Sequence, residues 1–214
     1  AGSKEIKWVQ SIRNLSLLGI DISGERIQHA AAKAKECKVE NRLIFETGNI
    51  NTMPLGQERY DLILFDSALH HFTPVDDVLD KVQRALKING FLIVNEYVGP
   101  SRFQWTERQL EIVNDLLKEI PAAYRRKLPN GSIKKKVYRP GKLSMYISDP
   151  SEAAESDKIE MELSERFDII ERKEYGGTIL QLLFKDIAGN FIDNDPETKT
   201  LLNHLFEAED RVLG

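Results

Sequence analysis

Polar side chains that could take part in chemistry stand directly after short apolar runs. Asp66-Ser67 follows the run 61–65, and the paired histidines His70-His71 come soon after. A neutral imidazole there could remove a proton from a hydroxyl or an amine. Glu96-Tyr97 follows the run 91–94 and could supply a base or an orienting group. We expect one histidine of the pair to be structural, because adjacent side chains rarely both point inward.

These residues do not predict a metal site. The other histidines, His29 and His204, are distant in sequence, and no carboxylate has a spacing that would complete a ligand set. The single cysteine, Cys37, cannot form an internal disulfide or a Cys-rich metal site. Nothing at the start resembles a secretory signal, so a reducing cytoplasm is the expected location.

The elements that must position these residues alternate between short apolar runs and longer helical stretches. Parallel strands joined by crossover helices give this pattern. It predicts strands at 17–20, 42–47, 61–65, 91–94 and 167–172, and helices at 4–14, 24–38, from Pro74 to Asn89-Gly90, at 106–120 and 150–164, with two more after a Gly176-Gly177 turn. Ser3 and Ser23 are candidate helix caps. The expected fold class is α/β, a doubly wound, mostly parallel sheet with flanking helices.

Length and composition suit one globular domain over residues 1–214. Hydrophobic residues make up 41% of the chain and charged residues 30%, which excludes a mostly disordered protein. No apolar run approaches the roughly 20 residues of a membrane-spanning helix. The formal net charge is −4, too small to predict a nucleic-acid partner.

A loop-rich insertion, 121–147, concentrates basic residues with no acid between Tyr124 and Lys142. We expect it to cover the pocket as a lid that attracts an anionic small-molecule acceptor. The alternative is a solvated loop, since charge runs are usually exposed. Nucleic-acid binding is disfavoured because no RNA-binding module accompanies the run.

Four stretches, taken in order, resemble a known family. They are Leu18–Ser23, Gly48-Asn49-Ile50 with Pro54, Tyr60–Phe72, and Leu86–Val94. Together they resemble the class I S-adenosylmethionine-dependent methyltransferases, which have a Rossmann-like fold. The resemblance implies an enzyme that moves a methyl group from S-adenosyl-L-methionine to an oxygen or nitrogen of a small or medium-sized acceptor. The alternative is a methyltransferase-like binding or scaffold module without activity.

The resemblance also implies cofactor contacts. Asp21 would accept hydrogen bonds from the ribose hydroxyls, with a helix-capping role as the alternative. Ile22 would pack on the adenine. Asn49 stands where the family usually has an acid that binds the adenine amino group, and Ile50 lies beside it. An ordinary Gly-Asn turn is the alternative for Asn49.

The remaining implied contacts concern the methionine part and the glycine-rich loop. Asp66 and Ser67 would hold the methionine part, and the base would be one of three residues, His71, His70 or Glu96. Gly2 precedes Asp21 by about the family's spacing between its last loop glycine and the acid. If Gly2 is that glycine, a vacancy is expected between strands 17–20 and 61–65. The alternative is that the first three residues are a cloning remnant.

Overall fold

The computed structural model describes residues 2–213 and has an α/β architecture with helices flanking parallel strands. Its contacts divide the chain into two compact units. The first contains Ala1–Phe65 and Phe72–Val94, and the second contains Asp66–His71 and Asn95–Gly214. None of the helices described between residues 2 and 213 combines the length and apolar character that crossing a membrane requires.

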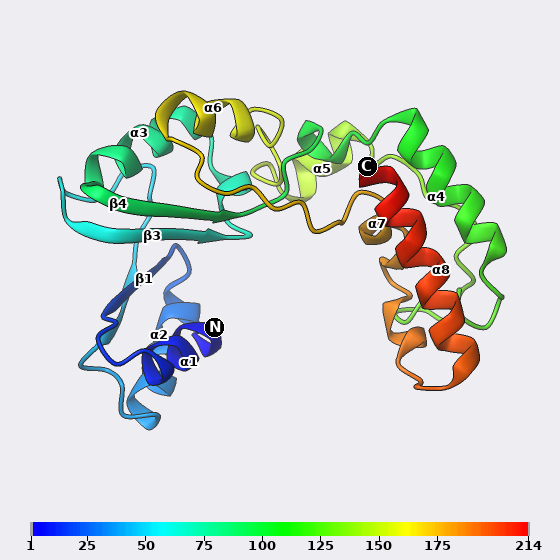
Figure 1. The fold of residues 1–214 in the computed structure, drawn as a ribbon, viewed down its shortest axis with the longest axis horizontal. Helices are drawn as coiled ribbons and strands as arrows, with labels where there is room; N and C mark the ends of the chain where they lie inside the picture. Colours follow the sequence, from blue (N-terminus) through cyan, green and yellow to red (C-terminus); the bar gives the residue numbers. More distant parts are fainter. Residues whose placement is uncertain (1, 214) are drawn as a thin grey trace. The chain divides into compact units, whose positions relative to one another are not determined.

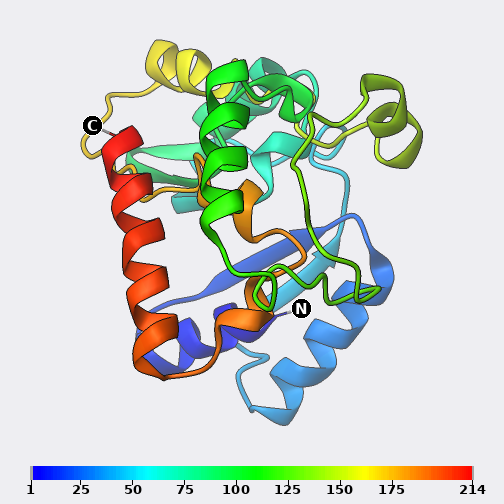
Figure 2. The same cartoon turned by 90° about the vertical axis from the view of Figure 1, so that its right-hand side faces the viewer.

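In the first unit, β1 (Leu17–Asp21) pairs in parallel with β2 (Leu43–Thr47) (Figure 2). Helices α1 (Ser3–Ser11) and α2 (Gly24–Glu36) pack on this pair and share a buried core with it. Ser23 caps α2 as predicted, because its hydroxyl accepts a hydrogen bond from the Arg26 N–H. Gly2, rather than Ser3, occupies the N-cap of α1. The apolar periodicity therefore located these elements, but α1 ends at Ser11, before the predicted residue 14, and its cap differs from the predicted one.

A second pair in the same unit consists of β3 (Tyr60–Asp66) and β4 (Leu86–Asn95) (Figure 1). The Arg59 N–H donates to the Ala85 carbonyl at one end, and the Ser67 N–H donates to the Asn95 carbonyl at the other. Both strands therefore run in the same direction. Helix α3 (Val75–Ala85) forms the crossover connection between these two strands, and one apolar face of the helix is buried. Among residues 2–213, β1 and β3 are not hydrogen-bonded to each other.

Two of the predicted boundaries in this region were wrong. Helix α3 ends at Ala85, and Asn89-Gly90 lies inside β4 instead of ending the helix. A Cβ atom on Gly90 would lie only 3.0 Å from the Tyr60 carbonyl oxygen. Glycine at this position thus allows the two strand backbones to approach each other closely. The sequence alone does not distinguish this role from the termination of a helix.

Helices α4 (Glu107–Glu119), α7 (Leu180–Phe184) and α8 (Pro196–Leu213) form the core of the second unit. A capping box between Thr106 and Gln109 begins α4 near its predicted start. At the predicted turn, Gly176 and Gly177 have φ values of 104° and 93°, a backbone conformation that favours glycine, but no turn is assigned to either residue. The remaining short helices of this unit are η1 (Leu69–His71), η2 (Ser101–Phe103), α5 (Lys142–Ser148), α6 (Ile159–Arg166) and η3 (Ala188–Phe191).

The segment 150–172 differs from its prediction. Residues 150–158 form turns, with Ala153 at a left-handed φ of 48°, so only α6 remains of the predicted helix. No strand is assigned at 167–172 in the part of the chain that the structure describes. Ile169 and Ile170 are exposed there, because no neighbouring strand covers them. Apolar content without a pairing partner does not make a strand.

Two buried charged side chains form hydrogen bonds with the free backbone groups at the two ends of α7. The Glu209 carboxylate accepts hydrogen bonds at the N-terminal end from the backbone N–H groups of Thr178, Ile179 and Leu180. The Lys134 ammonium donates at the other end to the carbonyls of Leu182, Leu183 and Lys185. Burial lowers the pKa of Lys134 to about 8. Lys134 therefore stabilises the core, so this basic residue of the insertion 121–147 is not available to attract an acceptor, and a role for the rest of the insertion stays a prediction.

Lys134→Ala should lower the free energy of unfolding by about 2–4 kcal/mol, because three buried carbonyls lose their donor. The matched control is Lys135→Ala, which changes an exposed neighbour and should shift stability by less than about 0.5 kcal/mol. Urea unfolding of both variants measures the difference. Equal midpoints for the two would contradict a structural role for Lys134.

Candidate active site

The buried carboxylate of Glu96, directly after β4, organises the turn η1. Its Oε1 accepts hydrogen bonds from the backbone N–H groups of Ala68 and Leu69, and its Oε2 lies 2.5 Å from His70 Nδ1. The Glu96 side chain has no exposed surface. A carboxylate is tolerated in such surroundings when hydrogen-bond donors replace water, and three donors do so here. Glu96 therefore fixes both the turn and the ring of His70.

The hydrogen bond to Glu96 decides which nitrogen of His70 can accept a proton. Because the carboxylate is an acceptor, Nδ1 of the neutral ring carries the hydrogen and Nε2 carries the lone pair. The same hydrogen bond raises the pKa of His70 above its usual value; burial opposes this rise, and the charges of Glu96, Glu152 and Asp149 reinforce it. His70 thus has the geometry of an oriented general base.

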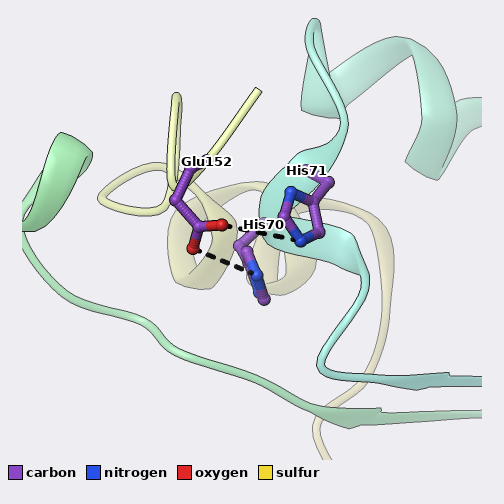
Figure 3. A group of neighbouring side chains, drawn as sticks. All are labelled: His70, His71 and Glu152. Carbon is purple, nitrogen blue, oxygen red and sulfur yellow. Dashed lines mark ion pairs between the residues drawn. The ribbon is translucent and has the colours of Figure 1, made fainter. Parts of the chain in front are cut away.

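His71 lies beside His70, and both rings face Glu152 (Figure 3). The ring centroids are 4.2 Å apart. Glu152 Oε1 lies 3.7 Å from His70 Nε2, and Glu152 Oε2 lies 3.9 Å from His71 Nε2. The tight turn η1 thus places both rings against one carboxylate, and the expectation that one histidine of the pair is structural stays a prediction.

The orientation of His71 follows from Ser151 and Asp149. The Ser151 hydroxyl donates to Asp149 Oδ1 at 2.6 Å, so its oxygen is an acceptor toward His71 Nδ1, 3.3 Å away. Nδ1 of the neutral His71 ring therefore carries the hydrogen. The lone pair of His71 is on Nε2, the nitrogen that faces Glu152.

The loop that carries Glu152 is tied to the segment after β4. Arg102 donates from Nη1 to the Pro150 carbonyl and from its backbone N–H to the Ala153 carbonyl, each at 2.6 Å. The Ser156 hydroxyl donates to the Gly99 carbonyl at 3.0 Å. Glu152 was not among the predicted site residues, because these tertiary contacts, rather than its spacing to the histidines, place it. The turn-forming Asp149-Pro150 pair was the one local signal.

Asp66 and Ser67 contact Asn95 at the end of the neighbouring strand β4, and Tyr97 contacts the segment that follows this strand. Asp66 Oδ1 accepts a hydrogen bond from Asn95 Nδ2 at 2.8 Å, and Ser67 has a left-handed φ of 54°. The Tyr97 hydroxyl donates to the Pro100 carbonyl, and burial raises the pKa of Tyr97 to about 12. Tyr97 therefore stays protonated near neutral pH and cannot serve as the base. The roles of Asp66 and Ser67 in binding methionine remain predictions.

Five of the residues expected to bind the cofactor, Gly2, Asp21, Ile22, Asn49 and Ile50, lie in the first unit, whereas Asp66 and Ser67 belong to the second. Asp21 Oδ1 accepts a hydrogen bond from the Ser23 N–H at 2.8 Å, and Oδ2 lies 3.4 Å from Arg26 Nη1. Ile22, next to Asp21, is 71% exposed. Asp21 thus helps to begin α2, while its partly exposed carboxylate retains capacity to accept further hydrogen bonds.

Three further candidates in this unit have structural contacts. Asn49 Oδ1 accepts a hydrogen bond from the Asn51 N–H at 2.9 Å, which is the turn geometry considered as the alternative. The Ile50 carbonyl accepts one from Lys81 Nζ at 3.1 Å. Gly2 has a φ of 80°, and a Cβ atom there would lie 3.0 Å from the Ala30 Cβ. Cofactor contacts by these residues remain predictions.

Glu96→Gln should lower the pKa of His70, because the amide removes the negative charge while its oxygen can still accept the two backbone hydrogen bonds. In the wild type, the raised pKa contributes stability that is complete below the unfolded-state value near 6.5 and is lost as the pH rises through the folded-state value. NMR titration of the His70 ring in both proteins measures the shift. An unchanged His70 titration would show that Glu96 does not govern this ring.

Comparisons with known proteins point to one family. The family described as "Methyltransferase domain" matches residues 7–141, more than half of the chain. The erythromycin 3''-O-methyltransferase of Saccharopolyspora erythraea is 23% identical over 97 residues, 45% of this chain and 32% of that protein. The uncharacterised methyltransferase YcgJ of Bacillus subtilis is 35% identical over 81 residues, 37% of this chain and 32% of that protein.

The solved structure of YcgJ covers 86% of this chain and 71% of its own, with 19% identity and a TM-score of 0.45. The chain spans about a third of the length of the two curated relatives. Family membership rests on the match over residues 7–141, which includes β1 to β4 and the turn with both histidines. On that match, the chain belongs to the methyltransferase domain family.

Proposed function

We propose that the protein transfers a methyl group from S-adenosyl-L-methionine to an oxygen or nitrogen of a small or medium-sized acceptor. The observation that supports this most directly is the pairing of His70 Nδ1 with the buried Glu96 carboxylate in a chain of this family. When bound, the cofactor supplies a methyl group on a sulfonium, which is a good leaving group. The protein then has to align the acceptor, exclude water and accept a proton.

His70 accepts that proton. The hydrogen of an acceptor hydroxyl would pass to His70 Nε2 as that hydroxyl takes up the methyl group. Glu96 stabilises the imidazolium that results, because its carboxylate already accepts the Nδ1 hydrogen. An amine acceptor that is neutral when it reacts would release its proton to the same nitrogen.

The chemistry of the side chains around Asp21 fits a nucleoside. A carboxylate at the end of a parallel strand can accept hydrogen bonds from ribose hydroxyls. Asp21 is partly exposed, and the adjacent Ile22 offers an apolar surface for a flat base. Glycine at position 2 lets the start of α1 approach α2 closely. These features support cofactor binding in the first unit.

Asp21→Asn should weaken binding of S-adenosylmethionine by roughly 10- to 100-fold, the usual effect of losing hydrogen bonds to a charged group. The asparagine oxygen can still accept from the Ser23 N–H, so α2 should keep its start. Asp61→Asn is the matched control, because Asp61 is an exposed aspartate of the same unit that pairs with Lys87. Isothermal calorimetry measures both. Equal affinity in the two variants would remove Asp21 from the binding site.

His70→Gln should lower kcat by about 10²- to 10⁴-fold for a hydroxyl acceptor while leaving cofactor affinity nearly unchanged. Release of S-adenosylhomocysteine in the presence of a panel of small hydroxyl and amine compounds measures turnover. His204→Gln is the control, since His204 forms a surface pair with Glu119. A wild-type protein that binds the cofactor and methylates no member of the panel would favour the binding module over the enzyme.

A further inference from the structure

Three hydrogen-bond acceptors converge at η1. His70 Nε2, His71 Nε2 and the Glu152 carboxylate each offer a lone pair to the same small volume, and their ligand atoms lie within 4.8 Å of one another. Both Nδ1 atoms already have partners, Glu96 for His70 and Ser151 for His71. No donor lies among the three acceptors when both rings are neutral. Such an arrangement needs a donor or a cation among the three groups, which can be a water molecule, a proton or a metal ion.

The distances favour an ion over direct hydrogen bonds. The two nitrogen–oxygen separations, 3.7 and 3.9 Å, exceed the roughly 2.7–3.2 Å of a hydrogen bond. Ligand atoms about 2.0–2.2 Å from a tetrahedral zinc ion lie roughly 3.2–3.6 Å from one another. The side chains of His71 and Glu152 are 39% and 29% exposed. Rotation of these two side chains can therefore shorten the nitrogen–oxygen separations to those around a zinc ion without disturbing the core.

The outer contacts resemble those of a metal centre. Histidine ligands usually donate their second ring N–H to a carboxylate or a polar oxygen, which fixes the tautomer and aims the lone pair. Glu96 accepts the Nδ1 hydrogen of His70. The Ser151 hydroxyl, which itself donates to Asp149, accepts the Nδ1 hydrogen of His71. Arg102 fixes the loop that carries Glu152. The ligands are thus oriented by contacts that do not use their coordinating atoms.

The geometry points to a binding site for a divalent transition-metal ion, Zn²⁺, formed by His70 Nε2, His71 Nε2 and the Glu152 carboxylate. Two imidazoles and one carboxylate suit zinc, whereas magnesium and calcium prefer oxygen ligands alone. Three protein ligands leave a fourth position for water or another oxygen. All residues of the site belong to the second unit.

This site has one consequence that rests on the proposed function. Zinc and the proton of the acceptor would use the same lone pair on His70 Nε2. Bound zinc should therefore block His70 as a base and slow methyl transfer. The binding itself does not depend on that function and is measured without cofactor or acceptor.

The test is a Zn²⁺ titration of the metal-free full chain against a chromophoric chelator. We expect one equivalent to bind, Glu152→Gln and His71→Gln to weaken binding at least about tenfold, and Glu96→Gln to weaken it roughly 10- to 100-fold as an outer partner. His204→Gln is the matched control, because it removes a surface histidine that also pairs with a glutamate, and it should leave zinc affinity unchanged. Magnesium should not compete.

NMR of the wild type keeps the proposal testable if a variant does not fold. Adding Zn²⁺ should shift the Nε2 resonances of His70 and His71 and leave those of His29 and His204 in place. No zinc binding would overturn the site and indicate that Glu152 pairs with a protonated imidazole. Binding that survives both Glu152→Gln and His71→Gln would place the ion elsewhere. A protein that binds zinc but transfers no methyl group even when it is metal-free would leave the site intact and count against the proposed function alone.

Discussion

The candidate site depends on one buried carboxylate, that of Glu96. It has no exposed surface, and its oxygens contact two backbone N–H groups of η1 and the Nδ1 of His70. Glu96 directly follows β4, and its carboxylate lies beside η1, the turn that follows β3. In Glu96→Gln, the amide oxygen can still accept the backbone hydrogen bonds of η1, but the charged group that fixes the orientation of the His70 ring is lost.

Orientation at His70 also determines what the neighbouring groups can do. With the hydrogen on Nδ1, the ring offers Nε2 toward Glu152, and His71 does the same through its contact with Ser151. The same lone pair on His70 can accept a proton during transfer or bind a metal ion, but not both at once. One constraint therefore links the proposed chemistry to the proposed zinc site.

The sequence predicted β1, β2, β3 and the helix starts of the first unit well, because β1 and β3 are largely apolar runs and Ser23 and Pro74 mark helix starts. It also found His70, His71 and Glu96 from their places after strands. It missed Glu152 and the inward turn of Lys134, since both depend on contacts with residues far away in sequence. Residues 150–158 and 167–172 were misassigned because tertiary partners, rather than local propensity, decide their conformation.

The most direct test of this account is the tautomer of the two histidines, read from their ring nitrogen shifts by NMR in the metal-free protein at a pH where both rings are neutral. The account predicts that His70 and His71 each carry the hydrogen on Nδ1 and a bare lone pair on Nε2. A hydrogen on Nε2 of His70 would contradict it, because that nitrogen could then neither accept a proton from an acceptor nor bind zinc.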